Sequence, residues 1–298
     1  MSVYNGAEAL RSSLQSVFSQ KGADFEIIVI DDGSDDASGA MLNDLAAADS
    51  RLRVSHQGNQ GLTRALIRGC EMAKGKYIAR QDCGDLSLPG RLLAELQVLE
   101  SQPEAVFVSC GTSFVGPEGE PLYDVVVDEG EANAGLLTLD PRRLRGPSHH
   151  GSTMFSRALY EYVGGYREQF YFAQDLDLWT RMAEHGRHVA LPDLLYQARF
   201  TPGSISSTQR RRQIECAGII LDCARLRRAG LDESPALERA RSILPETGNA
   251  KASEVASALY FVGVCLQKKR NPRAAGYFRR ALQANPLHLK AALRLLAG

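Results

Sequence analysis

Apolar residues follow two alternating patterns along the first part of the chain. Leu10, Leu14 and Val17 recur at helical spacing, whereas residues 25–30 (FEIIVI) form a short, dense apolar run, which is typical of a strand buried on both faces. Strands that alternate with helices predict an α/β fold with a mostly parallel sheet flanked by helices. By the same patterns, further helices are expected near residues 37–48, 62–73 and 88–101, and further strands near 52–55, 76–79 and 105–110.

The second half of the chain has a different character. Residues 114–146 are rich in Gly and Pro turn signals, and we interpret them as a connection that reaches toward a bound substrate. Helices are expected near residues 157–163 and 175–185, each ended by glycine. Beyond residue 206 the pattern is helical. The sequence therefore predicts one domain over residues 1–206 and an all-α tail over residues 207–298.

Composition and charge narrow the class of protein. A chain of 298 residues that is 44% hydrophobic and 23% charged can bury a sizeable core, which excludes disordered and fibrous classes. Basic and acidic residues number 35 each, so no overall field favours nucleic acid. The six scattered cysteines lack metal-site spacing and are expected to be reduced thiols in a cytoplasmic protein. No apolar stretch approaches the roughly 20 residues that cross a bilayer.

One basic patch stands out against this balance, on the predicted helix after residue 209. A solvated helix face is the favoured interpretation, and contact with anionic lipid headgroups is the alternative. The patch consists of Arg210, Arg211, Arg212, Arg225, Arg227 and Arg228.

Acidic residues follow two of the predicted strands, at the strand ends where parallel sheets bind ligands. Asp32 can accept hydrogen bonds from a base or ribose, although Asp-Asp-Gly-Ser is also a good turn. Asp82 and Asp85 are close enough in sequence to share a divalent cation, and carboxylates suit Mg²⁺ or Mn²⁺. Helix capping is an equally good interpretation for Asp85, and a poorer one for Asp82.

Further candidates lie in the second half of the chain. Asp175 and Asp177 open the helix that contains Trp179, and capping of the helix dipole is the alternative role for both carboxylates. His149 and His150 could orient an acceptor or a diphosphate. Polar surface is the favoured interpretation for His149, and His150 is the expected site residue.

The order of these segments resembles the family 2 glycosyltransferases. Each motif alone is weak, but the order and spacing hold over about residues 1–206, which makes the joint signal specific. The matching segments are MSVYNG (1–6), IDDGSDD (30–36), NQGL (59–62), GKYIARQDCGD (75–85), SLPGR (87–91), HHGSTMF (149–155), GGY (164–166), AQDLDLW (173–179) and PGSIS (202–206).

The resemblance implies a Rossmann-like GT-A fold, inversion at the anomeric carbon, and usually a UDP-sugar donor. It implies that Asp175 is the base that deprotonates an acceptor hydroxyl, with Mn²⁺ or Mg²⁺ on the departing diphosphate. Residues implied on the donor side are Val3, Tyr4, Asp32, Arg64 and Asp82; those implied near the acceptor are His150, Asp177 and Trp179, and those implied at the metal are Asp82 and Asp85.

Three departures from the family pattern bear on activity. The usual Asp-x-Asp-Asp reads Asp82, Cys83, Gly84 and Asp85, so the middle aspartate is missing, and Thr201 stands where many relatives carry histidine. The sequence also begins inside the first motif, so nearly all of the preceding strand is absent. We expect unpaired backbone groups beside the nucleotide site, and either a start further upstream or a truncated, poorly active chain.

The tail contains one hairpin, at about residues 253–286, that resembles a tetratricopeptide repeat. Ala274, Phe278, Ala281 and Pro286 match its second-helix pattern. Because such units usually need about three copies to bury a core, we expect the hairpin to pack on neighbouring helices. A docking site for a protein partner in glycan assembly is the sharper alternative.

The family resemblance also sets the expected setting of the reaction. It implies transfer to a glycan or lipid-linked acceptor in cell-surface polysaccharide synthesis, in the cytoplasm or at the inner face of the plasma membrane. The alternative function is a catalytically weak or inactive transferase-like scaffold that works through its helical tail. A nucleotidyltransferase is disfavoured, because MSVYNG is not the Gly-rich basic loop of such enzymes.

Overall fold

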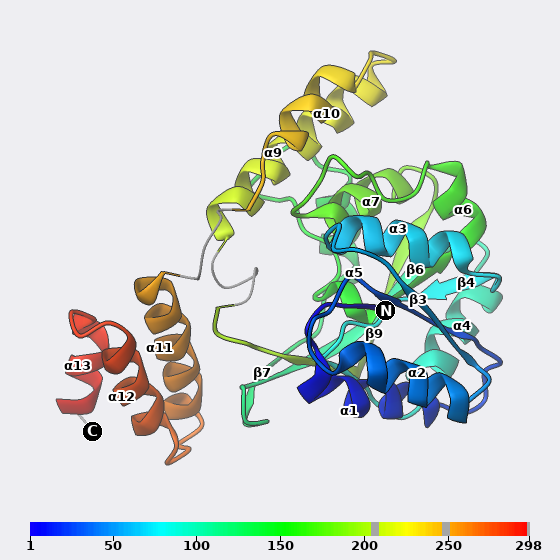
Figure 1. The fold of residues 1–298 in the computed structure, drawn as a ribbon. Coiled ribbons are helices and arrows are strands. Elements are labelled where there is room, and N and C mark those ends of the chain that lie inside the picture. Colours follow the sequence, from blue (N-terminus) through cyan, green and yellow to red (C-terminus); the bar gives the residue numbers. More distant parts are fainter. Residues whose placement is uncertain (204–208, 246–250, 297–298) are drawn as a thin grey trace. The chain divides into compact units, whose positions relative to one another are not determined.

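The chain is described by a computed structural model, shown in Figure 1, that covers residues 1–203, 209–245 and 251–296. The end of the last predicted motif, at Ser204–Ser206, lies outside these residues. The described residues form two compact units. The first unit comprises Met1–Thr112, Val125–Ala198 and Glu215–Leu244, and the second comprises Ser113–Asp124, Arg199–Ile214 and Pro245–Gly298. The predicted boundary at residue 206 stays a prediction.

Helices and strands alternate through the first unit as the hydrophobic pattern predicts. The strands are β1 (Ser2–Val3), β2 (Ile27–Asp31), β3 (Leu52–His56), β4 (Tyr77–Ala79), β5 (Leu86–Ser87), β6 (Ala105–Val115), β8 (Thr153–Ser156) and β9 (Arg187–Arg199). The helices are α1 (Ala7–Phe18), α2 (Ser38–Ala48), α3 (Leu62–Met72), α4 (Arg91–Ser101), α5 (Glu129–Leu136), α6 (Arg157–Tyr162), α7 (Gln174–Met182), α9 (Arg210–Arg228) and α10 (Ser234–Arg241), with a 3₁₀ turn η1 (His150–Ser152).

The strands form two sheets with different strand directions. Strands β1, β2 and β3 pair in parallel, and α3 lies on the opposite side of them from α1 and α2 (Figure 1). The second sheet has the order β4-β8-β6-β9-β5, in which β4 and β6 pair antiparallel with β8, and β5 pairs antiparallel with β9. The α/β class is therefore confirmed, and its parallel part is the three-stranded sheet.

The strand that we expected to be nearly absent is present as the two-residue strand β1. Ser2 and Val3 lie opposite Ile30 and Asp31 of β2. The backbone N–H of Ile30 donates to the Met1 carbonyl over 3.0 Å, and the Asp32 N–H donates to the Val3 carbonyl over 2.8 Å. The carboxyl end of β2, beside the loop that follows it, is thus hydrogen-bonded to β1.

Several segments differ from the sequence-based expectation, among them β8, for which no strand was predicted. Residues 114–146, predicted to be a loop-rich connection, contain the strand β7 (Pro121–Val125), which pairs with β6, and the helix α5. The long strand β9 was not predicted at all. Its interior residues Pro192, Asp193 and Leu194 break the apolar alternation on which strand prediction depends.

The core of the first unit is built around aromatic rings. Trp179 of α7 stacks on Phe107 of β6 with ring centroids 5.0 Å apart, and meets Phe155 of β8 edge-on at 5.5 Å. Helices α9 and α10 extend this unit, because Ile220 and Ala240 pack in one cluster with Phe170 and Phe172. The core therefore fixes α7 against the second sheet.

Half of the basic patch on α9 is neutralised within the first unit. Arg227 and Arg228 both pair with Glu184, at 2.7 Å each, and Arg225 pairs with Asp222 at 2.8 Å. These pairs agree with the favoured interpretation of a solvated helix face, and they reduce the positive charge that a lipid headgroup would meet.

The helical part of the second unit consists of α11 (Ala252–Lys268), α12 (Ala274–Ala284) and α13 (Leu289–Leu296). The ring of Phe278 on α12 lies against Gly263 of α11, where an added Cβ would sit 2.6 Å from a ring carbon. Tyr277 donates its hydroxyl to Glu120 over 2.6 Å. The predicted helical hairpin is present, and its assignment as a tetratricopeptide-like repeat stays a prediction.

The close contact at Gly263 predicts an effect on stability. Gly263→Val should lower the free energy of unfolding of the second unit by about 1–3 kcal/mol, because the added carbons overpack against Phe278. Gly276→Ala is the matched control, because nothing lies within 4 Å of its added Cβ. This substitution should raise the free energy of unfolding by up to about 1 kcal/mol, since alanine favours the helix. Urea unfolding followed by hydrogen exchange in α11 and α12 measures both, and equal effects would contradict the packing argument.

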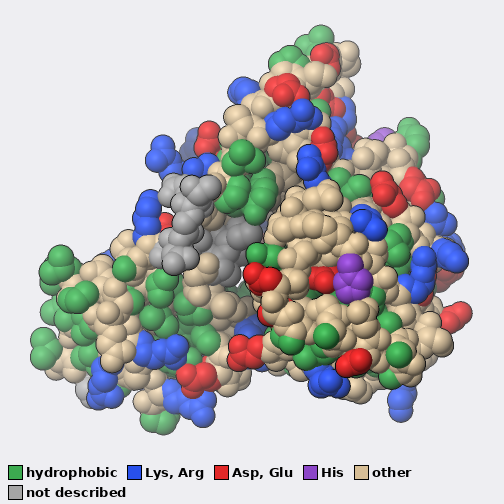
Figure 2. Space-filling view, in the orientation of Figure 1, with side chains coloured by type: hydrophobic (Ala, Val, Ile, Leu, Met, Phe, Trp, Pro, Cys, Tyr) green, Lys and Arg blue, Asp and Glu red, His purple; other side chains and the backbone are tan. Residues whose placement is uncertain are grey.

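Apolar side chains are exposed around α13, over the C-terminal helices in Figure 2. The most exposed are Leu287, Leu289, Leu293 and Leu296. Within residues 1–203, 209–245 and 251–296, no helix combines the length and the apolar character that a bilayer crossing requires.

Candidate active site

Three loops from distant parts of the sequence meet beside the ends of β1, β2 and β4. The N–H of Asn5 donates to the Ser34 hydroxyl over 3.0 Å, which joins the β1–α1 turn to the β2–α2 loop. The N–H of Gly84 donates to the Ser13 hydroxyl over 2.8 Å, which fixes the loop after β4 against α1. The polar segments that the sequence placed at strand ends therefore converge.

Asp32 orders the loop that leads into α3. It is 2% exposed, and its carboxylate accepts hydrogen bonds from the Gln57 side chain at 2.7 Å and from the N–H groups of Gln60 and Gly61 at 2.9 and 2.8 Å. Burial, and then the nearby charge of Asp32, raises the pKa of Tyr171. The Asp32 carboxylate thus stabilises the loop before α3 through hydrogen bonds, and the side chain of Tyr171 lies near this carboxylate.

The other predicted donor-side residues differ in exposure. Val3 is buried at 1% and belongs to the core under β1, whereas Tyr4 is 53% exposed. Arg64 lies on α3 and its Nε is 3.4 Å from a carboxylate oxygen of Glu168, with both side chains about half exposed. Because such exposed pairs contribute little to stability, Arg64 can exchange this partner for an anionic ligand.

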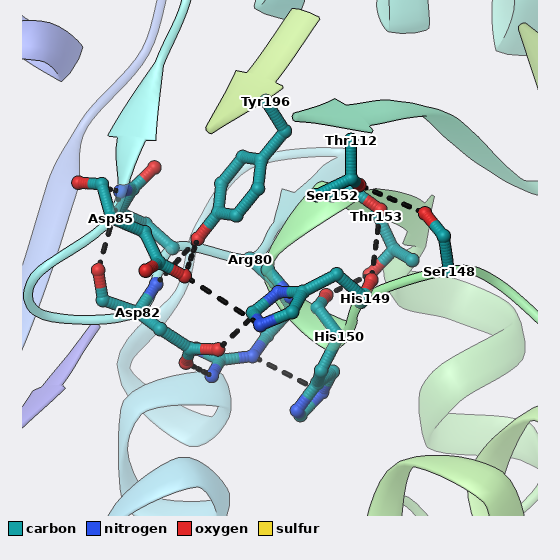
Figure 3. A network of polar contacts seen from close by, with 12 residues as sticks. Arg80, Asp82, Asp85, Thr112, Ser148, His149, His150, Ser152, Thr153 and Tyr196 are labelled. Atoms are coloured by element: carbon teal, nitrogen blue, oxygen red, sulfur yellow. Dashed lines mark hydrogen bonds and ion pairs between the residues drawn. The ribbon is translucent and has the colours of Figure 1, made fainter. Parts of the chain in front are cut away.

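Two carboxylates and one imidazole form a group of potential metal ligands, drawn in Figure 3. Asp82, Asp85 and His149 each offer a ligand atom, and these atoms all lie within 4.8 Å of one another. Nδ1 of His149 is 4.0 Å from Oδ2 of Asp82, and Nε2 is 3.7 Å from Oδ2 of Asp85. Nδ1 also accepts the Gly151 N–H at 3.0 Å, so in the neutral ring the proton lies on Nε2, on the side of Asp85.

Arg80 and Tyr196 hold the two carboxylates in place. Arg80 is 3% exposed and donates to Oδ1 of Asp82 over 2.6 Å. Burial alone would raise the pKa of Asp82, but Arg80 and the nearby histidines lower it to about 2. The Tyr196 hydroxyl donates to Oδ2 of Asp85 over 2.9 Å and accepts the Asp82 N–H over 3.2 Å. Asp82 is therefore charged at neutral pH and already oriented.

His150 lies behind this group. Its Nε2 is 2.7 Å from the Tyr166 hydroxyl and 3.2 Å from Nε of Arg80, which donates to it. Burial and then the Arg80 charge lower the pKa of His150 well below its usual value. His150 is thus an uncharged hydrogen-bond acceptor that positions Arg80, whereas the neighbouring His149, expected at the polar surface, lies with the carboxylates.

Asp175 lies in the first turn of α7, two residues after Ala173, which adopts a left-handed backbone conformation with φ of 55°. Burial raises the pKa of Asp175; the charge of Asp82 adds to the rise, and His149 opposes it. Among the described residues, no side chain is hydrogen-bonded to this carboxylate. Backbone hydrogen bonds from Leu176 and Asp175 also lower this pKa, but burial outweighs them, and a carboxylate with a raised pKa is suited to accept a proton.

Asp177 and Trp179 lie in the interior. Asp177 is 1% exposed and pairs with Arg181, one turn along α7, at 2.7 Å. Trp179 is 2% exposed within the aromatic core. These two residues can therefore affect an acceptor only indirectly, by fixing the position of α7.

Gly84 stands in the place of the missing aspartate, and the preceding Cys83 packs against the backbone. An added Cβ on Gly6 would sit 2.7 Å from its sulfur. Burial, followed by the charges of Asp82 and Asp85, raises the pKa of the thiol to about 12. Cys83 therefore stays protonated and fills space, because metal ligation requires the thiolate.

Sequence reasoning missed Arg80 and Tyr196. Arg80 could have been found, since it directly follows a strand and precedes Asp82 by two residues, the spacing that brings side chains to one face of an extended chain. Tyr196 is 111 residues from Asp85, and no local pattern joins them.

Comparison with known proteins gives the family. The sequence profile described as "Glycosyl transferase family 2" matches residues 1–162. EpsE of Bacillus subtilis (strain 168), a glycosyltransferase by name, is 30% identical over 207 residues, which cover 67% of this chain and 71% of EpsE. Protein y4gI of Sinorhizobium fredii (strain NBRC 101917 / NGR234) is 33% identical over 218 residues, which cover 70% of this chain but 23% of y4gI.

Solved structures share the fold at lower identity. The mannosyltransferase PcManGT from Pyrobaculum calidifontis, in complex with GDP-Man and Mn²⁺, superposes with a TM-score of 0.57 at 19% identity, covering 99% of this chain and 85% of PcManGT. Residues 1–349 of S. aureus TarS in complex with UDP-GlcNAc give 0.54 at 15% identity, covering 95% and 87%. The chain thus has a GT-A fold and belongs to glycosyl transferase family 2.

Proposed function

We propose that the chain transfers one sugar from a nucleotide diphosphate donor to an acceptor hydroxyl, with metal assistance and with inversion at the anomeric carbon. The observation that carries this proposal is the group formed by Asp82, Asp85 and His149, with Asp175 near enough for Asp82 and His149 to influence its pKa. Ligands for a cation that neutralises a diphosphate and a candidate base therefore occur in one site, as such a transfer requires.

The donor atoms fit a divalent cation. Asp82, Asp85 and His149 would hold it, with the His149 proton moving to Nδ1 and the Gly151 hydrogen bond given up if Nε2 is the ligand atom. The ion would stabilise negative charge on the departing diphosphate. Two carboxylates with one imidazole favour Mn²⁺ over Mg²⁺, because Mg²⁺ prefers oxygen ligands alone. Arg80 and Tyr196 keep Asp82 and Asp85 oriented, so little side-chain freedom is lost on binding.

A UDP-sugar is the proposed donor. Tyr4, which is 53% exposed beside the ordered Asp32 loop, offers a ring face to a base, and Arg64 offers a cation to the diphosphate. The TarS structures with UDP and UDP-GlcNAc make uridine the first nucleotide to test. GDP-Man, bound in PcManGT, is the second.

The transfer then follows from the roles of the side chains. Asp175 accepts the proton of the acceptor hydroxyl as its oxygen attacks the anomeric carbon. The bond from that carbon to the diphosphate oxygen breaks on the opposite face, so the product has inverted configuration and the nucleoside diphosphate leaves with the bonding electron pair. Arg64 would offset part of the charge of this leaving group, and a cation held by Asp82, Asp85 and His149 would offset more of it.

We further propose a glycan or lipid-linked acceptor in surface polysaccharide synthesis, with contact at the cytoplasmic membrane face and a protein partner for the tail. Family resemblance supports the acceptor. The exposed leucines around α13 support the partner.

The metal assignment predicts a specific loss of binding. His149→Ala and Asp85→Asn should each raise the Mn²⁺ concentration for half-maximal UDP release by about tenfold or more, since even outer contacts of metal sites change affinity by 10–100-fold. Electron paramagnetic resonance of Mn²⁺ gives the same affinities without turnover. Cys83→Ala is the matched control in the same loop and should bind Mn²⁺ normally.

Two outcomes would contradict the proposed function. Equal Mn²⁺ affinity in all four proteins would remove the metal site. If purified protein with Mn²⁺ releases no nucleoside diphosphate from any UDP- or GDP-sugar, the scaffold alternative replaces the transferase.

A further inference from the structure

A buried arginine of α4 lies close to the loop that carries Asp82 and Asp85. Arg91 and Glu95 are both 0% exposed and form an ion pair one turn apart on α4, with Nε of Arg91 3.2 Å from Oε1 of Glu95. The proposed transfer reaction does not use this pair. Because a charged group in the protein interior is costly, the contacts that the guanidinium makes outside α4 indicate its role.

The first of these contacts is with the ring of Tyr196 on β9. The guanidinium carbon of Arg91 lies 4.9 Å from the centre of this ring, which is within the range of a cation–π contact, and such contacts are stronger when both groups are desolvated. The Tyr196 hydroxyl reaches the carboxylate of Asp85 and the backbone of Asp82 (Figure 3). Arg91 therefore fixes the ring that orients both aspartates.

The second route runs through the side-chain amide of Gln81, which is also buried. Nη1 of Arg91 donates to Oε1 of Gln81 over 3.3 Å and to the Ser87 hydroxyl over 2.9 Å, and this hydroxyl donates to the same Oε1 over 2.7 Å. The amide nitrogen of Gln81 in turn donates to the backbone carbonyls of Asp85 and Asp82, at 2.9 and 3.3 Å. The main chain of the loop is thus connected to α4 as well.

We propose that Arg91 is a positioning residue for the potential metal ligands. Through Tyr196 it fixes the side chain of Asp85, and through Gln81 it fixes the backbone of the same loop. This inference deepens the proposed function and rests on it. An apolar residue in place of Arg91 would fill the volume, but it would donate no hydrogen bond to the amide and would not attract the face of the ring. The ligands would then be less ordered before a cation binds, which lowers affinity.

Removing the whole buried pair tests the proposal in a protein that should still fold. In Arg91→Met combined with Glu95→Leu, apolar side chains replace both charges, and such a replacement is often neutral for stability. The Gln81 oxygen and the Thr153 carbonyl both lose Arg91 as a donor, but each keeps a second donor, at 2.7 and 2.8 Å. The double variant therefore leaves neither acceptor unpaired.

Two measurements report the loss of positioning. The Mn²⁺ affinity of the double variant, measured by electron paramagnetic resonance, should fall about tenfold, the low end of the range for outer contacts of metal sites. Hydrogen exchange at the Asp82 amide, which donates to the Tyr196 hydroxyl, should become faster. A second variant, Arg91→Lys, keeps the buried charge but lacks the planar guanidinium, and it should show both changes as well.

Two controls separate positioning from stability. Asp177→Leu combined with Arg181→Met makes the same exchange in a second buried pair, whose side chains are 1% and 2% exposed, and should bind Mn²⁺ with native affinity. Glu95→Gln keeps an oxygen for Nε of Arg91 but removes the counter-charge, so it should unfold at a lower urea concentration and still bind Mn²⁺ normally. Burial, opposed by the Arg91 charge, raises the pKa of Glu95 to about 7, so the proteins are compared above that pH, where the carboxylate is ionised.

The proposal is overturned if the Arg91 variants bind Mn²⁺ with native affinity, or if their Asp82 amide exchanges at the native rate. It is also overturned if Glu95→Gln loses as much affinity as the double variant, because the loss would then follow the stability of α4. A native protein that binds no Mn²⁺ would contradict the metal site of the proposed function instead, and exchange at Asp82 would still decide the role of Arg91.

Discussion

Asp175→Asn should lower kcat for sugar transfer by about 10²- to 10⁴-fold, the range that general-base catalysis contributes. The amide keeps the shape of the side chain but cannot take the acceptor proton. Because no described side chain is hydrogen-bonded to the Asp175 carboxylate, the substitution breaks no internal ion pair, and the fold should be unchanged. Steady-state release of nucleoside diphosphate measures the loss.

The pH profile gives the prediction a second readout. Burial raises the pKa of Asp175 above its ordinary value, and a base works only in its ionised form. The kcat of the native protein should therefore fall as pH decreases through that raised pKa, and remain level above it. Asp175→Asn should lack this acidic limb.

Controls distinguish loss of the base from loss of structure. Asp44→Asn removes an exposed carboxylate of α2 and should keep the native rate. Donor affinity and the circular dichroism of Asp175→Asn should match those of the native protein. Full turnover in this variant, or an unchanged acidic limb, would remove Asp175 from the reaction.

Asp177→Ala, two residues further along α7, should instead destabilise the first unit by about 3–5 kcal/mol. Asp177 and Arg181 are 1% and 2% exposed and form a pair at 2.7 Å, and Arg167 approaches the same carboxylate at 3.7 Å. Removing the carboxylate leaves a buried guanidinium without its counter-charge, which is the costly half of a buried ion pair. Urea or thermal unfolding measures the change.

A double variant tests the cause of that loss. Asp177→Leu combined with Arg181→Met removes both charges and should recover most of the lost stability, because apolar replacement of a whole buried pair is often neutral. If Asp177→Ala alone unfolds at the same denaturant concentration as the native protein, the pair is not a major stabilising contact. The two aspartates of one motif thus separate into a chemical and a structural role.

The sequence predicts the fold where local patterns are sufficient. Residues 27–30 are apolar without interruption because β2 is covered on both faces, and the strand predicted at residues 25–30 is correct within two residues. Strand direction is not local information, so the predicted strands β4 and β6 were expected in a parallel sheet, whereas both pair antiparallel with β8. Neither β8 nor β9 was predicted. The two strands also join distant segments, as in the pairing of Leu86 with Gln197.

The candidate site divides in the same way. Asp82 and Asp85 follow a strand and attract attention from position alone. His149 and His150 are neighbours in an identical local context, and η1 turns one ring toward the carboxylates and the other toward Tyr166. That difference depends on contacts with β4 and β9, which no pattern in a single sequence records.

The hydroxyl of Tyr196 has a consequence for a residue outside the group that it holds. Gly151 lies so close to this hydroxyl that any Cβ at position 151 would overlap it. A larger residue there would displace the phenol, release Asp85 and the Asp82 backbone together, and disturb the ring of His149 stacked on it. The positions of the three potential ligands, Asp82, Asp85 and His149, therefore depend on a residue without a side chain at position 151.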